Sequence, residues 1–150
     1  MSGEAPHEFV DANILVYAFD ASAGEKKATA ERLLARLWED GAGCLSVQVL
    51  QEFFVTVTAK VARPLKVDEA ADRIRELSAW SVFAPTAEDV VAAIALHQHA
   101  KLSFWDAMVV HAAAESGCDV LWTEDLNDGQ VLRGVEVRNP FATAIRRPSR

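Results

Sequence analysis

The stretch EFVDANILVYAF, residues 8–19, places one carboxylate, Asp11, between two apolar runs. A short apolar run that ends at a charge is typical of a buried strand that hands over to another element. Asp11 is therefore predicted to lie at a strand exit, where open parallel sheets bind their ligands. Taken alone, it could equally cap a short helix that begins near Asn13.

Similar apolar runs recur along the chain and alternate with helical patterns. Strands are expected in EFVD (8–11), GCLSV (43–47), SVFAP (81–85), CDVLWT (118–123) and VEVRN (135–139). Helical patterns cover residues 24–41, 49–61, 67–80, 86–100 and 105–117, although 49–61 is rich in β-branched residues. This alternation predicts an α/β fold whose mostly parallel central sheet has helices on both faces.

Three of the helical patterns carry further signals. Residues 24–41 form an amphipathic pattern that Gly41 would end, with an apolar stripe at Ala30, Leu33, Leu34, Leu37 and Trp38. Thr86 and Asp89 resemble a capping box ahead of a second stripe at Ala87, Val90, Val91, Ile94 and Ala95. The run WDAMVVHAAAESG is apolar almost all round, so it is predicted to lie inside the fold, with His111 as a core histidine.

Length and composition indicate one domain over residues 1–150, with a core of about 8–140 and an Arg-rich tail at 141–150. No apolar run approaches the roughly 18 residues that would span a bilayer, and the N-terminus carries acids where a secretory signal carries bases. Cys44 and Cys118 lack metal-ligand spacing and suit a reducing compartment. These features predict a cytoplasmic protein without membrane contact.

The net charge of -7 by itself disfavours a polyanionic partner. The charge is unevenly distributed, however. Residues 129–150 hold five bases and one acid, whereas residues 1–128 hold ten bases and 21 acids. The body of the domain is therefore acidic and its C-terminal end is basic.

Four acids follow predicted strand exits or lie near the start of the next helix: Asp11, Glu52, Asp106 and Asp125. Each has a plain structural explanation to weigh. Asp106 could complete a capping box with Ser103, and Asp125 could be a turn residue. Glu52 is harder to explain in this way, because it lies among apolar neighbours in LQEFFV.

If the four acids converge, they need a counter-charge. Two carboxylates about 5 Å apart repel by roughly 3 kcal/mol at an effective dielectric near 20. Mg²⁺ and Mn²⁺ prefer such oxygen ligands, and protein-bound Mg²⁺ usually keeps positions for water and substrate phosphate. The pattern therefore predicts a divalent metal site for phosphate chemistry.

The four motifs VDANIL, LSVQVLQEF, LSFWDAMVV and LWTEDLNDG resemble those of PIN-domain ribonucleases, especially VapC-type toxins of bacterial toxin–antitoxin modules. The resemblance covers roughly residues 8–140 and implies a three-layer α/β/α PIN-like domain. It also implies that Asp11, Glu52, Asp106 and Asp125 bind metal, with Asp128 as a less certain fifth acid. Small polar residues beside the acids are expected to orient them, namely Asn13, Ser46, Ser103 and Thr123.

The implied activity is cleavage of RNA phosphodiester bonds with Mg²⁺ or Mn²⁺. Candidate phosphate contacts are Lys60, Arg63, Lys66, Arg133 and the other arginines of the C-terminal stretch. The family resemblance further implies a homodimer that a small antitoxin neutralises, with the antitoxin tail covering the acidic groove and presenting an Arg to it.

Other functions stay open at this point. A haloacid dehalogenase-type phosphatase also begins with Asp at the first strand exit, but it needs a second Asp where this chain has Asn13. A phosphoacceptor signalling domain would need adjacent acids before its first helix and a late Lys, and neither is evident. A catalytically weak domain of the same fold could instead only bind RNA or an antitoxin.

Overall fold

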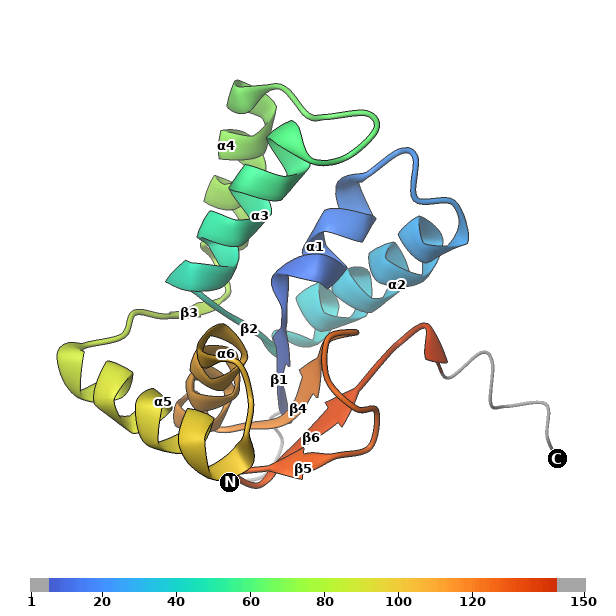
Figure 1. The fold of residues 1–150 in the computed structure, drawn as a ribbon. Helices are drawn as coiled ribbons and strands as arrows, with labels where there is room; N and C mark the ends of the chain where they lie inside the picture. The colour runs from blue at the N-terminus through green and yellow to red at the C-terminus, as the bar shows by residue number, and fades with distance from the viewer. Residues whose placement is uncertain (1–5, 143–150) are drawn as a thin grey trace, which may run out of the picture.

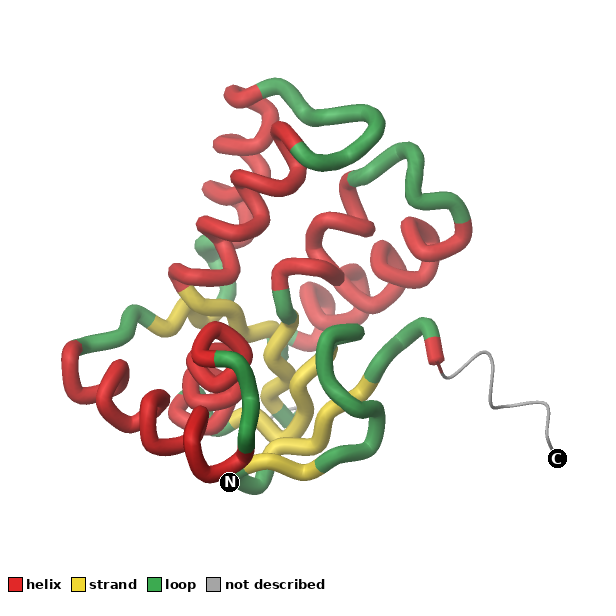
Figure 2. The backbone as a smooth tube through the Cα atoms, viewed as in Figure 1, coloured by secondary structure: helices red, strands yellow, loops and turns green. Residues whose placement is uncertain are grey.

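The computed structural model describes residues 6–142. The elements are, in order, β1 (His7–Val10), α1 (Ala12–Phe19), α2 (Glu25–Asp40), β2 (Gly43–Ser46), α3 (Val47–Ala59), α4 (Val67–Leu77), β3 (Ser81–Phe83), α5 (Ala87–Ala100), α6 (Phe104–Glu115), β4 (Cys118–Trp122), β5 (Val131–Leu132) and β6 (Val135–Arg138). Helices flank the central strands in Figures 1 and 2. Arg146, Arg147 and Arg150 of the predicted tail lie outside the described residues.

The strands form one sheet in the order β3-β2-β1-β4-β6-β5. The pairs β1–β2, β1–β4, β2–β3 and β4–β6 are parallel, and only the pairing of β5 with β6 is antiparallel among the described strands. The predicted α/β fold with a mostly parallel sheet is therefore confirmed. The two-residue strand β5 was not predicted, because so short a run has no measurable alternation.

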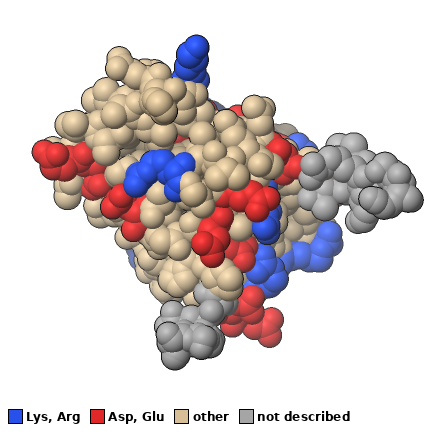
Figure 3. All heavy atoms as spheres, turned by 90° about the horizontal axis from the view of Figure 1, so that it is seen from below, with Lys and Arg blue, Asp and Glu red and all other residues tan. Residues whose placement is uncertain are grey.

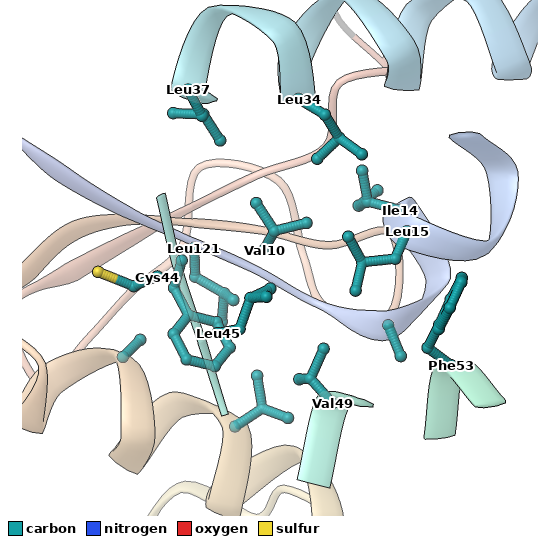
Figure 4. Close-up of a cluster of buried hydrophobic side chains, with 14 of the residues drawn as sticks. Val10, Ile14, Leu15, Leu34, Leu37, Cys44, Leu45, Val49, Phe53 and Leu121 are labelled. Atoms are coloured by element: carbon teal, nitrogen blue, oxygen red, sulfur yellow. The ribbon is translucent and has the colours of Figure 1, made fainter. Parts of the chain in front are cut away.

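Helices cover the sheet on both sides. In Figure 4, Leu34 and Leu37 reach the strands from α2, whereas α6 lies on the opposite side of them. The strands contribute Val10, Leu45 and Leu121 to the core between these layers, all completely buried. Buried on both faces, the central strands read as continuous apolar runs, as parallel strands do. Cys44 and Cys118 are buried free thiols within this core.

Local signals set the helix ends largely as predicted. Gly41 adopts a left-handed conformation and ends α2, and Thr86 and Asp89 form a complete capping box at the start of α5. The β-branched run after β2 forms helix α3, since its buried side chains Val49, Phe53 and Val57 recur at helical spacing against the core. Of the helices in residues 6–142, none has the length and apolar character that crossing a membrane requires.

The apolar stripe on α5 faces outward. Val90, Val91 and Ile94 are 36%, 58% and 44% exposed, while Ala93 is fully buried against α6. Alanines on several sides of α5 make its apolar direction ambiguous, so contacts elsewhere set its rotation. Trp38 on α2 also departs from its predicted stripe and is 49% exposed.

His111 anchors α5 and the β5–β6 turn to the buried helix α6. Its side chain is 2.8 Å from Asp89 of α5 through Nε2 and 2.8 Å from the Arg133 guanidinium through Nδ1. Because arginine only donates, Nδ1 accepts and Nε2 donates its proton to the carboxylate of Asp89. The hydrogen bond from His111 lowers the pKa of Asp89, followed by the backbone hydrogen bond at Thr86. These two contacts agree with the prediction of a satisfied core histidine. The contact with His111 also holds the Asp89 side of α5 toward α6.

Gly43 allows Trp80 to pack flat on the start of β2. A Cβ at Gly43 would lie 2.3 Å from the Trp80 ring, closer than any real contact. Trp80 lies between α4 and β3, and its ring centroid is 5.8 Å from that of Trp38. The absence of a side chain at Gly43 therefore determines how α4 returns to the sheet.

We expect Gly43→Ala to lower the free energy of unfolding by about 1–3 kcal/mol, because the added methyl group must displace an indole ring. Denaturant unfolding measures this loss. In a double-mutant cycle, Trp80→Leu should remove most of the extra cost of Gly43→Ala. Equal costs of Gly43→Ala in both backgrounds would contradict the steric explanation.

Candidate functional site

The carboxyl ends of β1, β2 and β4 border one cavity. It has a volume of about 520 Å³ and lies between α1 and α3, with two acids of the sheet edge at its base. Its lining residues are Asp11, Ala12, Asn13, Val16, Tyr17, Asp20, Glu52, Thr56, Val61 and Asp125. Figure 1 shows α1 and α3 rising side by side from this edge of the sheet. Three of the four predicted acids therefore line a single cavity.

Asp11 is the most strongly perturbed acid of the cavity. It is 5% exposed, and its carboxylate accepts hydrogen bonds from Ala12 N at 2.7 Å and Thr123 Oγ1 at 2.8 Å. Burial raises the pKa of Asp11 to about 7, aided by the charges of Asp125 and Glu52 and opposed by those hydrogen bonds. Asp11 does cap α1, but a cap alone does not require a carboxylate buried beside two others.

The Asn13 side chain joins the acids from β1 and β4. Its amide nitrogen is 2.9 Å from Asp125 Oδ2, 3.3 Å from Thr123 Oγ1 and 3.4 Å from Asp11 Oδ2. Its oxygen accepts the backbone N–H of Glu124 at 3.4 Å. Thr123 is completely buried and also accepts the Asp125 N–H at 3.0 Å. Asn13 and Thr123 thus hold two carboxylates that would otherwise repel each other.

Glu52 reaches the cavity from the second turn of α3. Gln48, one turn earlier, donates to Glu52 Oε2 at 3.1 Å and lies 3.4 Å from the carbonyl oxygen of Trp105. Gln48 therefore orients Glu52 and also ties α3 to the first turn of α6. Ser46, whose hydroxyl accepts Val49 N–H at 3.2 Å, caps α3 and does not contact a carboxylate among the described residues.

Asp106 lies beside Asp125, although it does not line the cavity itself. Ser103 caps α6 by accepting the Asp106 N–H at 3.0 Å. Within residues 6–142 the reciprocal bond from Ser103 N–H to the Asp106 carboxylate is missing, whereas Thr86 N–H donates to Asp89 at 2.7 Å. The capping-box explanation therefore does not account for this carboxylate. Burial and the charge of Asp106 raise the pKa of Asp125, and the hydrogen bond from Asn13 opposes them.

The remaining predicted residues lie apart from the acids. Asp128 accepts the Asn139 N–H at 2.8 Å, as a turn residue would, and does not line the cavity. Arg133 precedes β6 and lies at the opposite edge of the sheet, where it contacts His111 and Glu115. Lys60, Arg63 and Lys66 are exposed in the α3–α4 connection around Val61, and they form no ion pair with another described residue.

Three of the missed cavity residues carry polar groups: Tyr17, Asp20 and Thr56. Asn13, Val16, Tyr17 and Asp20 follow the i, i+3, i+4, i+7 spacing of one helix face. Thr56 likewise lies one turn beyond Glu52. This spacing could have indicated Tyr17, Asp20 and Thr56 once the helices after Asp11 and around Glu52 had been assigned to the site.

The donor set suits a hard divalent cation, although the carboxylates are not gathered into a complete metal site. Among the described residues, no three His, Cys, Asp or Glu side chains are close enough to hold an ion together. Burial, aided by the charges of Asp125 and Glu52, nevertheless raises the pKa of Asp11, and burial with the charge of Asp106 raises the pKa of Asp125. Carboxylate oxygens are hard ligands, so these side chains favour Mg²⁺ or Mn²⁺ over softer metals.

Comparisons with known proteins point to one family. The PIN-domain family model matches residues 9–129. None of the curated proteins matches the chain in sequence.

Solved structures share the fold at low sequence identity. A toxin–antitoxin complex from Klebsiella pneumoniae has a TM-score of 0.66 at 20% identity over 89% of this chain and 97% of that one. The toxin VapC20 of Mycobacterium tuberculosis, described as cleaving the sarcin-ricin loop, has a TM-score of 0.60 at 22% identity over 79% and 91% of the two chains. FitAB bound to a DNA fragment has a TM-score of 0.67 at 19% identity over 89% and 95%.

We expect Thr123→Val to lower the free energy of unfolding by about 1–3 kcal/mol, because it leaves Asp11 and the Asp125 N–H without their buried partner. Thr123→Ser keeps the hydroxyl and should cost less, about the 0.8 kcal/mol of one buried methylene group. Denaturant unfolding of both variants makes the comparison. A loss in Thr123→Val no larger than that in Thr123→Ser would contradict the importance of the hydrogen bonds, because valine keeps the methyl group and lacks only the hydroxyl.

We expect Asp11→Asn to raise the free energy of unfolding by about 1–3 kcal/mol at pH 8 in EDTA. The folded protein holds the Asp11 proton up to about pH 7, whereas the unfolded chain releases it near 3.8. Release of this proton therefore favours the unfolded chain increasingly as pH rises between these values, and the gain from Asp11→Asn should vanish near pH 4. Asp119→Asn, at an exposed position in β4, is the control; a loss of stability at pH 8 in Asp11→Asn alone would contradict the electrostatic account.

Proposed function

Since the chain belongs to the PIN-domain family, we propose that it is a metal-dependent endoribonuclease and the toxin of a toxin–antitoxin pair. One observation supports this proposal more strongly than the other observations do. Four acids from four separate segments interact electrostatically at one edge of the sheet, and the structural explanation for Asp106 fails. A fold that only bound a partner would not need to bury Asp11 among like charges.

Asp11, Glu52, Asp106 and Asp125 are the residues that would hold Mg²⁺ or Mn²⁺, and Asp128 is a weaker candidate because it is engaged in a turn. When bound, such ions supply an activated water and neutralise the charge that develops on a phosphodiester. The protein's own task is to hold the carboxylates in position. Asn13, Thr123 and Gln48 perform it through hydrogen bonds to Asp11, Asp125 and Glu52.

Exposed bases near the cavity are suited to the RNA backbone. Lys60, Arg63 and Lys66 surround Val61 at one rim and have no anionic partner within residues 6–142. On the opposite rim, Lys26 is 3.0 Å from Glu124, which follows Thr123 directly. On the face drawn in Figure 3, acidic and basic residues are instead interspersed. We therefore place the phosphate contacts at the cavity rims, and Arg133 in a structural role.

We further propose an antitoxin partner and a homodimer. The solved structures with this fold include a toxin–antitoxin complex, and this chain leaves apolar surface exposed at Val91 and Ile94 of α5. We propose a cytoplasmic location, which suits an RNA substrate and two free cysteines. The antitoxin tail is expected to cover the acidic cavity.

Two alternative functions predict different behaviour. A binding module would take up RNA without metal-dependent cleavage. The observation in its favour is that no three acids of residues 6–142 lie close enough together to hold an ion. A phosphatase of the haloacid dehalogenase type is disfavoured, because Asn13 uses its amide to bridge two carboxylates where that chemistry needs an acid.

Incubation of RNA with the protein and Mn²⁺ or Mg²⁺ should produce cleavage that EDTA abolishes. Asp11→Asn and Asp106→Asn should each reduce it by about 100-fold or more, since loss of a residue that merely orients a metal ligand already costs about 10–100-fold. Asp119→Asn should retain wild-type cleavage.

The outcomes separate the alternatives. Cleavage that persists in EDTA, or in both site variants, would refute the metal-nuclease proposal. RNA binding without metal-dependent cleavage would favour the binding module, and turnover of para-nitrophenyl phosphate would favour the phosphatase.

A further inference from the structure

The cavity extends well beyond the four acids. Asp11 precedes α1 and Asp20 follows it, and both line the cavity. At 1.5 Å per helical residue, the two ends of this interval are about 13 Å apart. Metal–oxygen distances are only about 2 Å, so an ion at Asp11 would leave the Asp20 end free. Space in the cavity is therefore available to another part of a ligand.

The walls at this end are apolar and fixed in position. Tyr17 projects from α1, and Thr56 and Val61 lie on the α3 side. The Tyr17 hydroxyl donates to Glu124, and its ring meets the edge of Phe141 with centroids 5.2 Å apart. The ammonium group of Lys26 lies 4.7 Å from the Tyr17 ring centroid. A ring held from three sides offers a binding surface with little loss of entropy.

Asp20 adds a hydrogen-bond acceptor to this end of the cavity. The residue is 7% exposed, and its Oδ1 accepts Ser22 N–H at 2.9 Å and the Ser22 hydroxyl at 2.5 Å. Those bonds form an ordinary turn after α1. Its Oδ2, however, accepts no hydrogen bond from any residue of 6–142. Oδ2 is not fully enclosed by protein atoms, so it is available to a donor group that enters the cavity.

We propose that the base of a nucleotide next to the scissile phosphate enters this end of the cavity, and that Asp20 selects guanine there. The inference rests on the proposed nuclease function. Unpaired bases in RNA are commonly recognised by aromatic side chains and through their Watson–Crick edges. Of the four bases, guanine presents two adjacent donors on that edge, N1–H and the N2 amino group, which point the same way toward a carboxylate.

The other bases fit an acceptor less well. Adenine and cytosine each offer one amino group beside a ring nitrogen whose lone pair would face the carboxylate. Uracil offers a single N–H between two carbonyl oxygens. The unused lone pairs of Asp20 Oδ2 therefore favour guanine and disfavour uracil, while Tyr17 and Val61 contact any base.

Single-stranded 12-mers of uridine with one guanosine, inosine, adenosine or cytidine at position 6, and the all-uridine strand, test the inference with Mn²⁺. The wild type should cleave next to guanosine with a kcat/KM at least about tenfold above that for the all-uridine strand. Inosine lacks the N2 amino group, so the kcat/KM for the inosine strand should lie between those for the guanosine strand and the all-uridine strand. Asp20→Asn keeps the size of the side chain and should reduce the guanosine-to-uridine ratio to near one.

Matched variants separate base selection from general damage. Tyr17→Leu should lower kcat/KM by about tenfold for every strand alike, since stacking on aromatic rings tolerates all bases. Asp119→Asn should stay near wild type, because Asp119 is exposed and does not line the cavity. Thermal unfolding of each variant shows whether it has folded.

Equal cleavage of all strands by the wild type, or a uniform loss in Asp20→Asn, would overturn the inference and leave the nuclease proposal standing. A cavity that receives an arginine of a protein partner in place of a base would give this result. If no strand is cleaved, the nuclease proposal fails instead. Binding of the same strands to Asp11→Asn then decides: at least tenfold tighter binding of the guanosine strand supports the selection of guanine, and equal binding refutes it.

Discussion

Asp11 carries a carboxylate that the fold has removed from water and surrounded with other carboxylates. Burial and the charges of Asp125 and Glu52 oppose its ionisation, and hydrogen bonds from Thr123 and Ala12 partly offset them. Asn13 is the neutral member of this arrangement. A carboxylate at its position would place a further charge about 3 Å from Asp125, whereas an amide can donate to several oxygens at once. A neutral side chain at position 13 thus limits the negative charge at this edge of the sheet when no cation is bound.

The topology of the sheet explains why this edge can collect residues from distant segments. β1 lies between β2 and β4, and the chain builds outward from β1 to β3 before it returns to β4. The strand order therefore reverses between β1 and β4, which is where ligands bind in open α/β sheets. Asp11 follows β1, Asp125 follows β4, and α3 carries Glu52 away from β2. Every acid is attached to the rigid end of a buried strand or to the first two turns of a helix.

Much of this arrangement could be predicted because it depends on local patterns. Apolar runs located the five longer strands, and Gly41 and Thr86 marked helix ends. The direction in which α5 packs could not be predicted, because its alanines leave the apolar side ambiguous and a contact with His111 decides it. Tyr17 and Asp20 were missed for another reason. They line a cavity only because α3 packs beside α1, and the spacing of residues along one helix cannot predict that contact.

Ser103 and Thr86 show why a motif needs its hydrogen bonds before it can be interpreted. Both precede a helix with an acid three residues later, and both accept that residue's N–H. Of the two acids, only Asp89 accepts a hydrogen bond from the backbone N–H of its cap residue, Thr86. Its other carboxylate oxygen is hydrogen-bonded to His111. Asp106 instead places its charge near Asp125. One sequence pattern therefore has two physical outcomes, and the partner of the carboxylate distinguishes them.

The same reasoning separates the carboxylates at the two ends of α1. Asp11 lies among other acids, so a cation beside it would stabilise its charged form, as the proposed metal site requires. Asp20 lies about 13 Å farther along the helix, beside a turn that satisfies one of its oxygens and leaves the other without a hydrogen bond from residues 6–142. Without neighbouring acids, that oxygen has no need of a divalent ion and acts as a hydrogen-bond acceptor. An acidic cavity can thus serve a polyanionic substrate in two ways, through ions at one end and through donors on a base at the other.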